Sequence, residues 1–520
     1  MELKKQSVRQ NIEKAKEFLQ ITLDDDYIIK DNKPDALKII CSHGMAEIED
    51  KRISGESVWI TGKLIFSVLY RSDDIDKKPE ALKAAIPFQE KVYVAGIEES
   101  DRINVNCKVE DLSVGLINSR KMSVRSLLNI EVCVSREEEI EIASEISDDN
   151  QMEIEQLIEE KDMLCLTVAK KDILRIRKEM QLPKSKPNIL SMIYDYGDLR
   201  NIDYVEKEDK LLVTGEIHIF ILYETEEGQC EWYDTMTEFS GNLSLGGNED
   251  NQIWWINLEP AQIQLWAETD FDGEQRQIGM ELVFDVQIKG WKEQRLPVLA
   301  DLYSLKENVL PVYSREKAWS LLMKNIAKCS VNEQIHMPAG EEKIMQICSC
   351  KSQVMIERKT PAERGVEVSG VINVETLYIT SDDGFPLVHR TDQLPFSQLI
   401  EAPGILQDCS YELSSSVEML QVNLLDNMEF EIKAVINIML FALHAEEINV
   451  IKSINMVDTD GDEEKLPGMT GYIVTEKERL WDIAKKYKTT VKNIMEINDL
   501  ENDEVVPGDK IMIVKSPVRC

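Results

Sequence analysis

Residues 61–70 read TGKLIFSVLY, and similar decapeptides occur at residues 214–223 (TGEIHIFILY) and 369–378 (SGVINVETLY). In each copy, a hydroxyl residue and a glycine precede alternating apolar residues that end in Leu-Tyr, and the glycines lie 153 and 155 residues apart. Alternation with a period of two, rich in β-branched residues, is typical of a β-strand. A glycine inside a strand often marks a bulge or a close backbone approach, and the closing tyrosine is expected to pack its ring on the core. The pattern therefore predicts one β-strand that recurs in three copies of a domain.

The agreement between the copies extends beyond these strands. Pro34 matches Pro187 at the same offset of 153, whereas the third copy lacks this proline. Phe88 and Phe396 each follow the closing tyrosine by 18 residues, and Phe239 lies near that point in the second copy. A unit of this length is too long for a solenoid repeat, so we predict three tandem, mainly β, sandwich-like domains. The alternative is one large β protein in which the internal similarity arose by chance.

The segments between the copies set the predicted domain boundaries. Arg136 to Glu141 is dominated by charged residues, and Trp319, Leu322 and Ile326 have the spacing of one helix face. The predicted order is an N-terminal helical segment at 1–20, β repeats at 21–136, 164–300 and 329–450, an acidic linker at 137–163, a connecting helix or linker at 301–328, a linker at 451–469 and a small C-terminal domain at 470–516.

The composition excludes several classes of function. The 520 residues include 96 acidic and 60 basic ones, and the formal net charge of −36 argues against nucleic acid or an anionic membrane surface as the main partner. Residues 1–20 contain no continuous apolar stretch of the kind found in secretory signals, so we expect a cytoplasmic protein. Ten scattered cysteines form no disulfide framework, which fits a reducing compartment.

Residues 471–515 follow a different pattern. A short strand at 472–474 precedes apolar residues at helical spacing, Thr490 is a typical N-cap for a second helix, and 510–514 alternate as a last strand. This order of strand, helix, helix and strand resembles the LysM domain. The matching residues are Leu480-Trp481-Asp482-Ile483-Ala484, Asn498-Asp499-Leu500 and Pro507-Gly508-Asp509-Lys510-Ile511. LysM domains usually bind the N-acetylglucosamine chains of peptidoglycan or chitin.

The expected glycan groove departs from the LysM pattern at one loop. The resemblance places that groove between the loop after the first strand and the loop before the last. The first loop normally reads Gly-Asp-Thr, but here it reads Lys477-Glu478-Arg479. Glycine permits a close approach of the backbone to a ligand, which a residue with a Cβ atom does not. The change favours a charged surface that binds protein.

The candidate partner-binding residues therefore lie in this domain. They are Lys477, Arg479 and Trp481, with Asn498 and Leu500 on the adjacent loop. A few such anchors usually carry most of the binding energy of an interface. The alternative interpretation is core packing for Trp481 and Leu500, and a solvated surface for the two cations.

With this C-terminal domain, the three repeats resemble the SPOCS domains of bacterial spore-coat proteins. The resemblance implies a non-enzymatic scaffold in the mother cell that lies at the forespore surface and promotes localisation and encasement of the coat. It also implies a direct partner, the spore-coat morphogenetic ATPase (SpoIVA-like), bound through the LysM domain, and possible contacts with other coat proteins. Several modules on one chain would gain affinity for a polymeric layer by multivalency.

The sequence contains no recognisable catalytic or cofactor motif. It has no Walker-type phosphate loop, no GxGxxG, no HExxH and no GxSxG. Cys41 with His43, and Cys348 with Cys350, are pairs two residues apart, but a zinc site needs four ligands. We therefore predict no catalytic residues, no metal and no cofactor. Two alternatives stay open: a peptidoglycan-binding protein that acts through its LysM domain, and a hydrolase that carries one.

Overall fold

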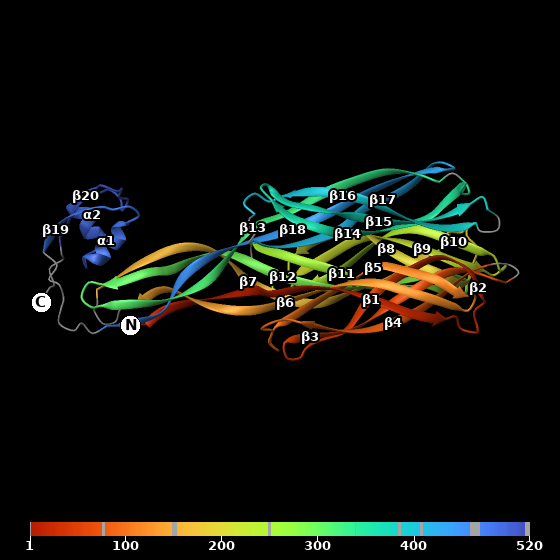
Figure 1. The fold of residues 1–520 in the computed structure, drawn as a ribbon, viewed down its shortest axis with the longest axis horizontal. Coiled ribbons are helices and arrows are strands. Elements are labelled where there is room, and N and C mark those ends of the chain that lie inside the picture. Colours follow the sequence, from red (N-terminus) through yellow and green to blue (C-terminus); the bar gives the residue numbers. More distant parts are fainter. Residues whose placement is uncertain are drawn as a thin grey trace.

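The computed structural model describes residues 2–74, 78–147, 153–247, 251–338, 340–382, 386–405, 409–457 and 468–514. Most of this part of the chain is β-strand, and a small domain with two helices lies at one end of the elongated molecule (Figure 1). The long strands fall into three successive units of six strands each. This arrangement confirms the predicted mainly β fold with three tandem copies.

The three units have matching strand orders. The first unit (residues 2–147) contains β1 (Glu2–Ile28), β2 (Ala36–Ile53), β3 (Ser57–Ser72), β4 (Pro79–Tyr93), β5 (Arg102–Asn118) and β6 (Lys121–Ser147). The second unit (154–304) contains β7 (Ile154–Gln181), β8 (Ile189–Lys207), β9 (Lys210–Thr225), β10 (Cys230–Ser244), β11 (Gln252–Thr269) and β12 (Gln275–Ser304). The third unit (309–456) contains β13 (Val309–His336), β14 (Ile344–Ala362), β15 (Gly365–Thr380), β16 (Leu387–Glu401), β17 (Ser410–Asp426) and β18 (Glu429–Met456).

Each unit is a sandwich of two antiparallel three-stranded sheets. In the first unit, β6 lies between β1 and β5 in one sheet, and β3 lies between β2 and β4 in the other. The second and third units repeat this order. The alternating apolar residues of the central strands face each other, as Ile60 and Leu64 of β3 and Leu128 and Ile130 of β6 show in the first core. The predicted sandwich is confirmed.

The repeated glycine and phenylalanine are cross-strand partners in all three units. Gly62 lies opposite Phe88, Gly215 opposite Phe239, and Gly370 opposite Phe396. A Cβ atom on Gly62 would lie 2.6 Å from the Phe88 ring and 2.6 Å from a backbone oxygen, so no larger residue fits without displacement. The glycine is therefore required by close approach of the opposite ring and backbone.

The repeated tyrosine and proline form a second link. The hydroxyl of Tyr70 donates a 3.2 Å hydrogen bond to the carbonyl of Pro34, and Tyr223 donates a 3.3 Å bond to that of Pro187. Both tyrosine rings are buried, and burial raises the pKa of each hydroxyl to about 12. Tyr378 is also buried, but its hydroxyl has no hydrogen-bond partner among the described residues. The third unit, which lacks the proline, lacks this link.

The outer strands of the three units continue beyond the sandwiches and form a stalk (Figure 1). We define the stalk as residues 2–12 with 136–147, 154–166 with 291–304, and 309–321 with 443–456, which pair as three antiparallel ribbons. The ribbons share an apolar interior. Its buried residues are Val8, Ile142, Met163, Cys165, Val298, Ala318, Ile448 and Val450. The stalk is thus a joint structure of all three units.

The stalk corrects three sequence predictions. Residues 1–20 were expected to be helical, but the described part of this segment belongs to strand β1. Residues 137–147 and 154–163, expected to be part of an acidic linker, are strand. Residues 309–328, expected to include a connecting helix, belong to β13, and residues 301–304 end β12. Of the predicted linker at 451–469, residues 451–456 end β18 and 458–467 lie outside the described residues.

Charge complementarity explains the first of these errors. The lysine-rich N-terminal strand lies beside the glutamate-rich end of β6, and oppositely charged side chains face each other. Lys5 contacts Glu141 at 2.7 Å, Lys4 contacts Glu145 at 3.1 Å, and Arg9 pairs with Glu137. Cross-strand ion pairs of this kind favour strand pairing, although the same composition is also typical of a solvated helix.

The three units meet along a common axis. Cys41 of β2, Tyr194 of β8 and Cys348 of β14 pack in one buried cluster. An open cavity of about 2380 Å³ lies beside this cluster and is lined by strands from all three units. The three repeats therefore pack side by side around a shared centre and do not form a row of separate domains.

A charged cluster joins the first and third units at this centre. The Lys351 ammonium lies 2.9 Å from both His43 Nδ1 and the Glu375 carboxylate, and His389 lies 3.1 Å from the same carboxylate. The Lys351 charge and burial lower the pKa of His43 to about 3. Burial acts to raise the pKa of Glu375, but Lys351 and His389 lower it to about 2. At neutral pH, the neutral imidazole of His43 therefore lies in contact with the charged pair formed by Lys351 and Glu375.

The C-terminal domain has the predicted order of elements. It contains β19 (Met469–Ile473), α1 (Leu480–Lys486), α2 (Val491–Ile497) and β20 (Lys510–Val514), and the two strands pair antiparallel. The Thr490 hydroxyl caps α2 by accepting a hydrogen bond from the Asn493 amide, as expected from the sequence. In the described part of the chain, no helix is long and apolar enough to cross a membrane.

Candidate docking site of the C-terminal domain

The loop between β19 and α1 places Lys477 in solvent. Lys477 is exposed and has a φ of 67°, in the left-handed region that favours glycine. Glu478 braces the loop, since its carboxylate accepts hydrogen bonds from the Thr475 amide at 2.9 Å and from the Tyr472 hydroxyl at 2.8 Å. The backbone of this loop thus keeps a glycine-type conformation, while a cationic side chain projects from it.

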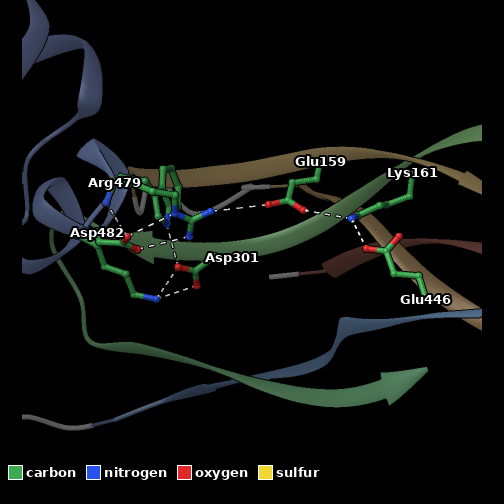
Figure 2. A network of polar contacts seen from close by, with 8 residues as sticks. Glu159, Lys161, Asp301, Glu446, Arg479 and Asp482 are labelled. Carbon is green, nitrogen blue, oxygen red and sulfur yellow. Dashed lines mark hydrogen bonds and ion pairs between the residues drawn. The ribbon is translucent and has the colours of Figure 1, made fainter. Parts of the chain in front are cut away.

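Arg479 is the N-cap residue of helix α1, and its side chain reaches the stalk. Its backbone amide donates to the Asp482 carboxylate at 3.0 Å, and its guanidinium contacts the same carboxylate at 3.3 Å. The guanidinium also lies 3.7 Å from Glu159 on β7 (Figure 2). Hydrogen bonding to Asp482 raises the pKa of Arg479 above its ordinary value. Arg479 therefore connects the helix start to the stalk.

Asp301 at the end of β12 is the centre of the contact between the C-terminal domain and the stalk (Figure 2). Its carboxylate accepts a 2.8 Å hydrogen bond from the Trp481 indole and a 2.7 Å bond from the Lys485 ammonium. Tyr313 on β13 donates a third bond at 2.8 Å. Burial acts to raise the pKa of Asp301, but the bonds from Lys485, Trp481 and Tyr313 lower it below its ordinary value.

Apolar packing surrounds this carboxylate. The rings of Tyr303 and Trp481 meet edge to face, with 4.9 Å between their centres. The Tyr303 hydroxyl donates a 2.7 Å hydrogen bond to the carbonyl of Thr489. Leu157 and Leu305 pack on the core of the C-terminal domain, although neither belongs to it. The domain is therefore fixed to the stalk by both polar and apolar contacts.

The two remaining predicted residues have structural contacts within the domain. The Asn498 side chain donates to the carbonyls of Ile494 and Met512 at 2.7 Å and accepts from the Met512 amide at 2.6 Å. Leu500 is half-buried and packs on the same core. Among the five candidates, Lys477 projects into solvent, and Trp481 and Arg479 contact the chain's own stalk.

Sequence reasoning missed the stalk half of this contact. Asp301 and Tyr303 lie in a segment that was expected to be a linker or helix, and 180 residues separate Asp301 from Trp481. No spacing rule connects residues so far apart. One signal was available in the sequence. Apolar residues and a tyrosine flank Asp301 at the end of the second repeat, as they would at the end of a β-strand.

A groove of about 880 Å³ runs beside the contact, between the stalk and helix α2. The stalk contributes Glu155, Gln156 and Leu157 to its walls. The C-terminal domain contributes Trp481, Val491, Lys492, Met495, Glu496, Asp499, Leu500, Asn502 and Asp503. The groove therefore exists only because the domain is docked.

The cysteine and histidine pairs that the sequence singled out lie near the common axis. Burial raises the pKa values of the Cys41 and Cys348 thiols to about 12, so both stay protonated at neutral pH. His43 accepts a contact from Lys351, as described above. Among the described residues, no group of three or more His, Cys, Asp or Glu side chains has the arrangement needed to hold a metal ion.

Comparison with protein families agrees with these domains. The family model described as "SipL, SPOCS domain" matches residues 35–117 and again residues 343–425, and the LysM domain model matches residues 472–514. The chain thus contains two segments that match the SPOCS domain and one that matches the LysM domain. The two SPOCS matches cover β2 to β5 of the first unit and β14 to β17 of the third. The second unit repeats the same strand order.

The matched SPOCS and LysM domains indicate a general role for the chain. They fit a protein associated with the spore coat, and both are families of non-catalytic domains. LysM domains are compatible with either protein or glycan interactions. No curated protein and no solved structure matches this chain.

Proposed function

We propose that this SPOCS and LysM protein is a non-enzymatic scaffold of the endospore coat in the mother-cell cytoplasm. In this role it docks onto the layer of the coat morphogenetic ATPase (SpoIVA-like) at the forespore surface and promotes encasement. The LysM domain makes the direct contact, and the SPOCS units carry further contacts with coat proteins. A chain that engages a polymeric layer at several points gains affinity by multivalency. The net charge of −36 keeps the free protein dispersed.

The loop at Lys477 is the observation that carries the proposal. Its backbone adopts the left-handed conformation that glycine supplies in the LysM pattern, but the residue is a solvent-exposed lysine. Arg479 replaces the small threonine and is held by Asp482 and Glu159. A bulky, cationic loop of this kind suits a protein surface better than a sugar chain that must lie close to the backbone.

The five predicted residues have different parts in this proposal. Lys477 is reachable by a partner in the docked arrangement, and Leu500 lines the groove. Trp481 and Arg479 hold the domain on the stalk, so they position the partner surface in addition to any direct contact. Asn498 fixes the loop after α2 by its bonds to Met512.

The second candidate function is binding of peptidoglycan, and the LysM fold itself favours it. It requires that N-acetylglucosamine chains still fit the altered loop. It also places the site of action at wall material, whereas the scaffold places it at the surface of the forespore.

Co-sedimentation separates the two functions. The purified full chain is offered polymerised coat ATPase and purified peptidoglycan in parallel, beside a Lys477→Ala/Arg479→Ala variant. The scaffold predicts sedimentation with the ATPase, weakened in the variant, and none with peptidoglycan. Sedimentation with peptidoglycan alone would overturn the proposal. A Lys510→Ala variant, altered at an exposed lysine of β20, controls for the loss of positive charge.

A further inference from the structure

The groove between the stalk and helix α2 has an apolar floor. Leu157 comes from the stalk, and Val491, Met495 and Leu500 come from the C-terminal domain. All four are partly buried side chains that pack on the core of that domain. Methionine adapts its shape to different partners and recurs on binding surfaces. The groove is therefore suited to apolar side chains of a bound segment.

The rim of the groove is acidic. Glu155, Glu496, Asp499 and Asp503 line it, against one lysine, Lys492. Lys492 lies 3.9 Å from Glu496, whereas the other three carboxylates have no ion-pair partner in the described part of the chain. Burial raises the pKa of Glu155 above its ordinary value. A half-buried carboxylate without a cation gains most from a partner that supplies one.

We propose that this composite groove binds a segment of the partner protein that carries cationic side chains beside apolar ones. The proposal rests on the proposed function, because the segment belongs to the partner that the LysM domain binds. The apolar residues of the segment lie on the floor formed by Leu157, Met495 and Leu500, and its cations meet the unpaired carboxylates of the rim. Charge complementarity of this kind sets specificity and speeds association.

The stalk forms part of this recognition surface. Glu155 and Leu157 belong to β7, so part of the recognition surface lies outside the LysM domain. The docked arrangement supplies this part before the partner arrives, and such preorganisation lowers the entropic cost of binding. A substitution on the stalk is thus expected to weaken binding even though it leaves every LysM residue intact.

The test measures binding of the full chain to immobilised coat ATPase. We compare the unaltered chain, a stalk variant (Glu155→Lys), and a rim variant (Glu155→Gln/Asp499→Asn/Asp503→Asn). Asparagine is chosen at 499 because Asp499 has a φ of 51°, which asparagine tolerates. Both variants are expected to weaken binding about tenfold, and the loss in the rim variant should shrink at high salt.

Charge-matched controls carry the same changes outside the groove. Glu160→Lys lies on the exposed face of the same strand, and Glu160→Gln/Glu476→Gln/Glu504→Gln removes three charges from exposed positions. Both should bind like the unaltered chain. Circular dichroism and melting temperature verify that every variant is folded.

The outcomes distinguish this inference from the proposed function. If the unaltered chain does not bind the ATPase, the proposed function fails and the inference fails with it. If the unaltered chain binds and the folded stalk and rim variants bind equally well, only the inference is overturned. Weakening in the groove variants, with none in the controls, supports both. Weakening in the rim variant but not in Glu155→Lys would also overturn the composite groove.

Discussion

The indole of Trp481 donates a 2.8 Å hydrogen bond to the carboxylate of Asp301, although 180 residues separate the two. The bond joins the LysM domain to the end of the second β unit. Lys485 adds a charged contact to the same carboxylate, and Tyr303 adds an aromatic one to Trp481. The LysM domain is therefore mounted on the stalk in a defined orientation.

Replacement of Asp301 by alanine is expected to release the LysM domain from the stalk. The substitution removes charge-assisted bonds from Trp481 and Lys485, each worth about 1.5–3 kcal/mol. The indole N–H resonance of Trp481, assigned by a Trp481→Phe variant, should shift upfield in the NMR spectrum. The control is Glu446→Ala, because Glu446 pairs with Lys161 in the same region but does not contact the LysM domain. An unchanged resonance in Asp301→Ala would contradict the docked arrangement.

Replacement of Gly62 by alanine should destabilise the first unit. The added Cβ atom would lie 2.6 Å from both the Phe88 ring and the Glu47 carbonyl oxygen, and overpacking of this kind costs about 1–3 kcal/mol. Thermal melting followed by circular dichroism measures the effect. Gly468→Ala is the matched control, since a Cβ atom there meets nothing within 4 Å. Equal melting temperatures for the two variants would show that the glycine is not required by packing.

The hydroxyls of the repeated tyrosines should contribute unequally to the free energy of unfolding. Tyr70→Phe removes a hydrogen bond to the Pro34 carbonyl and is expected to cost about 0.5–1.5 kcal/mol. Tyr378→Phe is the internal control, because Tyr378 occupies the matching position and its hydroxyl has no hydrogen-bond partner in the described structure. Removal of the Tyr378 hydroxyl should therefore change the free energy of unfolding little. Urea unfolding of both variants tests the difference, and a larger loss for Tyr378→Phe would contradict the assignment.

The cluster at the common axis should make the protein sensitive to acid. The pKa of His43 is about 3 in the folded chain, against an ordinary 6.5, so the unfolded chain binds a proton first as the pH falls below 6.5. Glu375 has a folded pKa of about 2 against an ordinary 4.5. The stability that His43 and Glu375 contribute to the folded chain is fully present at neutral pH. It is lost progressively between pH 6.5 and 3 for His43, and between pH 4.5 and 2 for Glu375.

A His43→Gln variant isolates the histidine. Glutamine can accept the hydrogen bond from Lys351 but does not titrate. The melting temperature of this variant should fall less steeply than that of the unaltered chain between pH 6.5 and 4.5. His336→Gln, at an exposed histidine, should follow the unaltered chain. Parallel curves for all three proteins would show that His43 does not contribute.

The strand repeat could be predicted because its determinants are local. The alternation in residues 61–70 and its two copies identifies the strand, and the glycine, phenylalanine and tyrosine recur at spacings set by one sandwich. The pairing of Gly62 with Phe88 explains why these residues stand at those positions. The LysM domain was predicted for the same reason, since its elements contact each other within a short segment.

The stalk could not be predicted because it depends on distant pairing. Trp319, Leu322 and Ile326 have helical spacing, yet they lie in β13, where Ile326 is 57% exposed and the other two are half-buried. Their partners on β18 lie more than 100 residues away, and sequence spacing carries no information about them. The same holds for Asp301 and Trp481. The sequence therefore indicated only the LysM residues of the candidate site and none of its stalk residues.

Calorimetric titration of the full chain with the coat ATPase, in the presence and absence of an N-acetylglucosamine oligomer, tests the central claim most directly. The account predicts saturable binding to the ATPase, with an affinity that the oligomer leaves unchanged. Binding of the oligomer together with no heat from the ATPase would contradict the scaffold. That result would assign the LysM domain to a glycan instead.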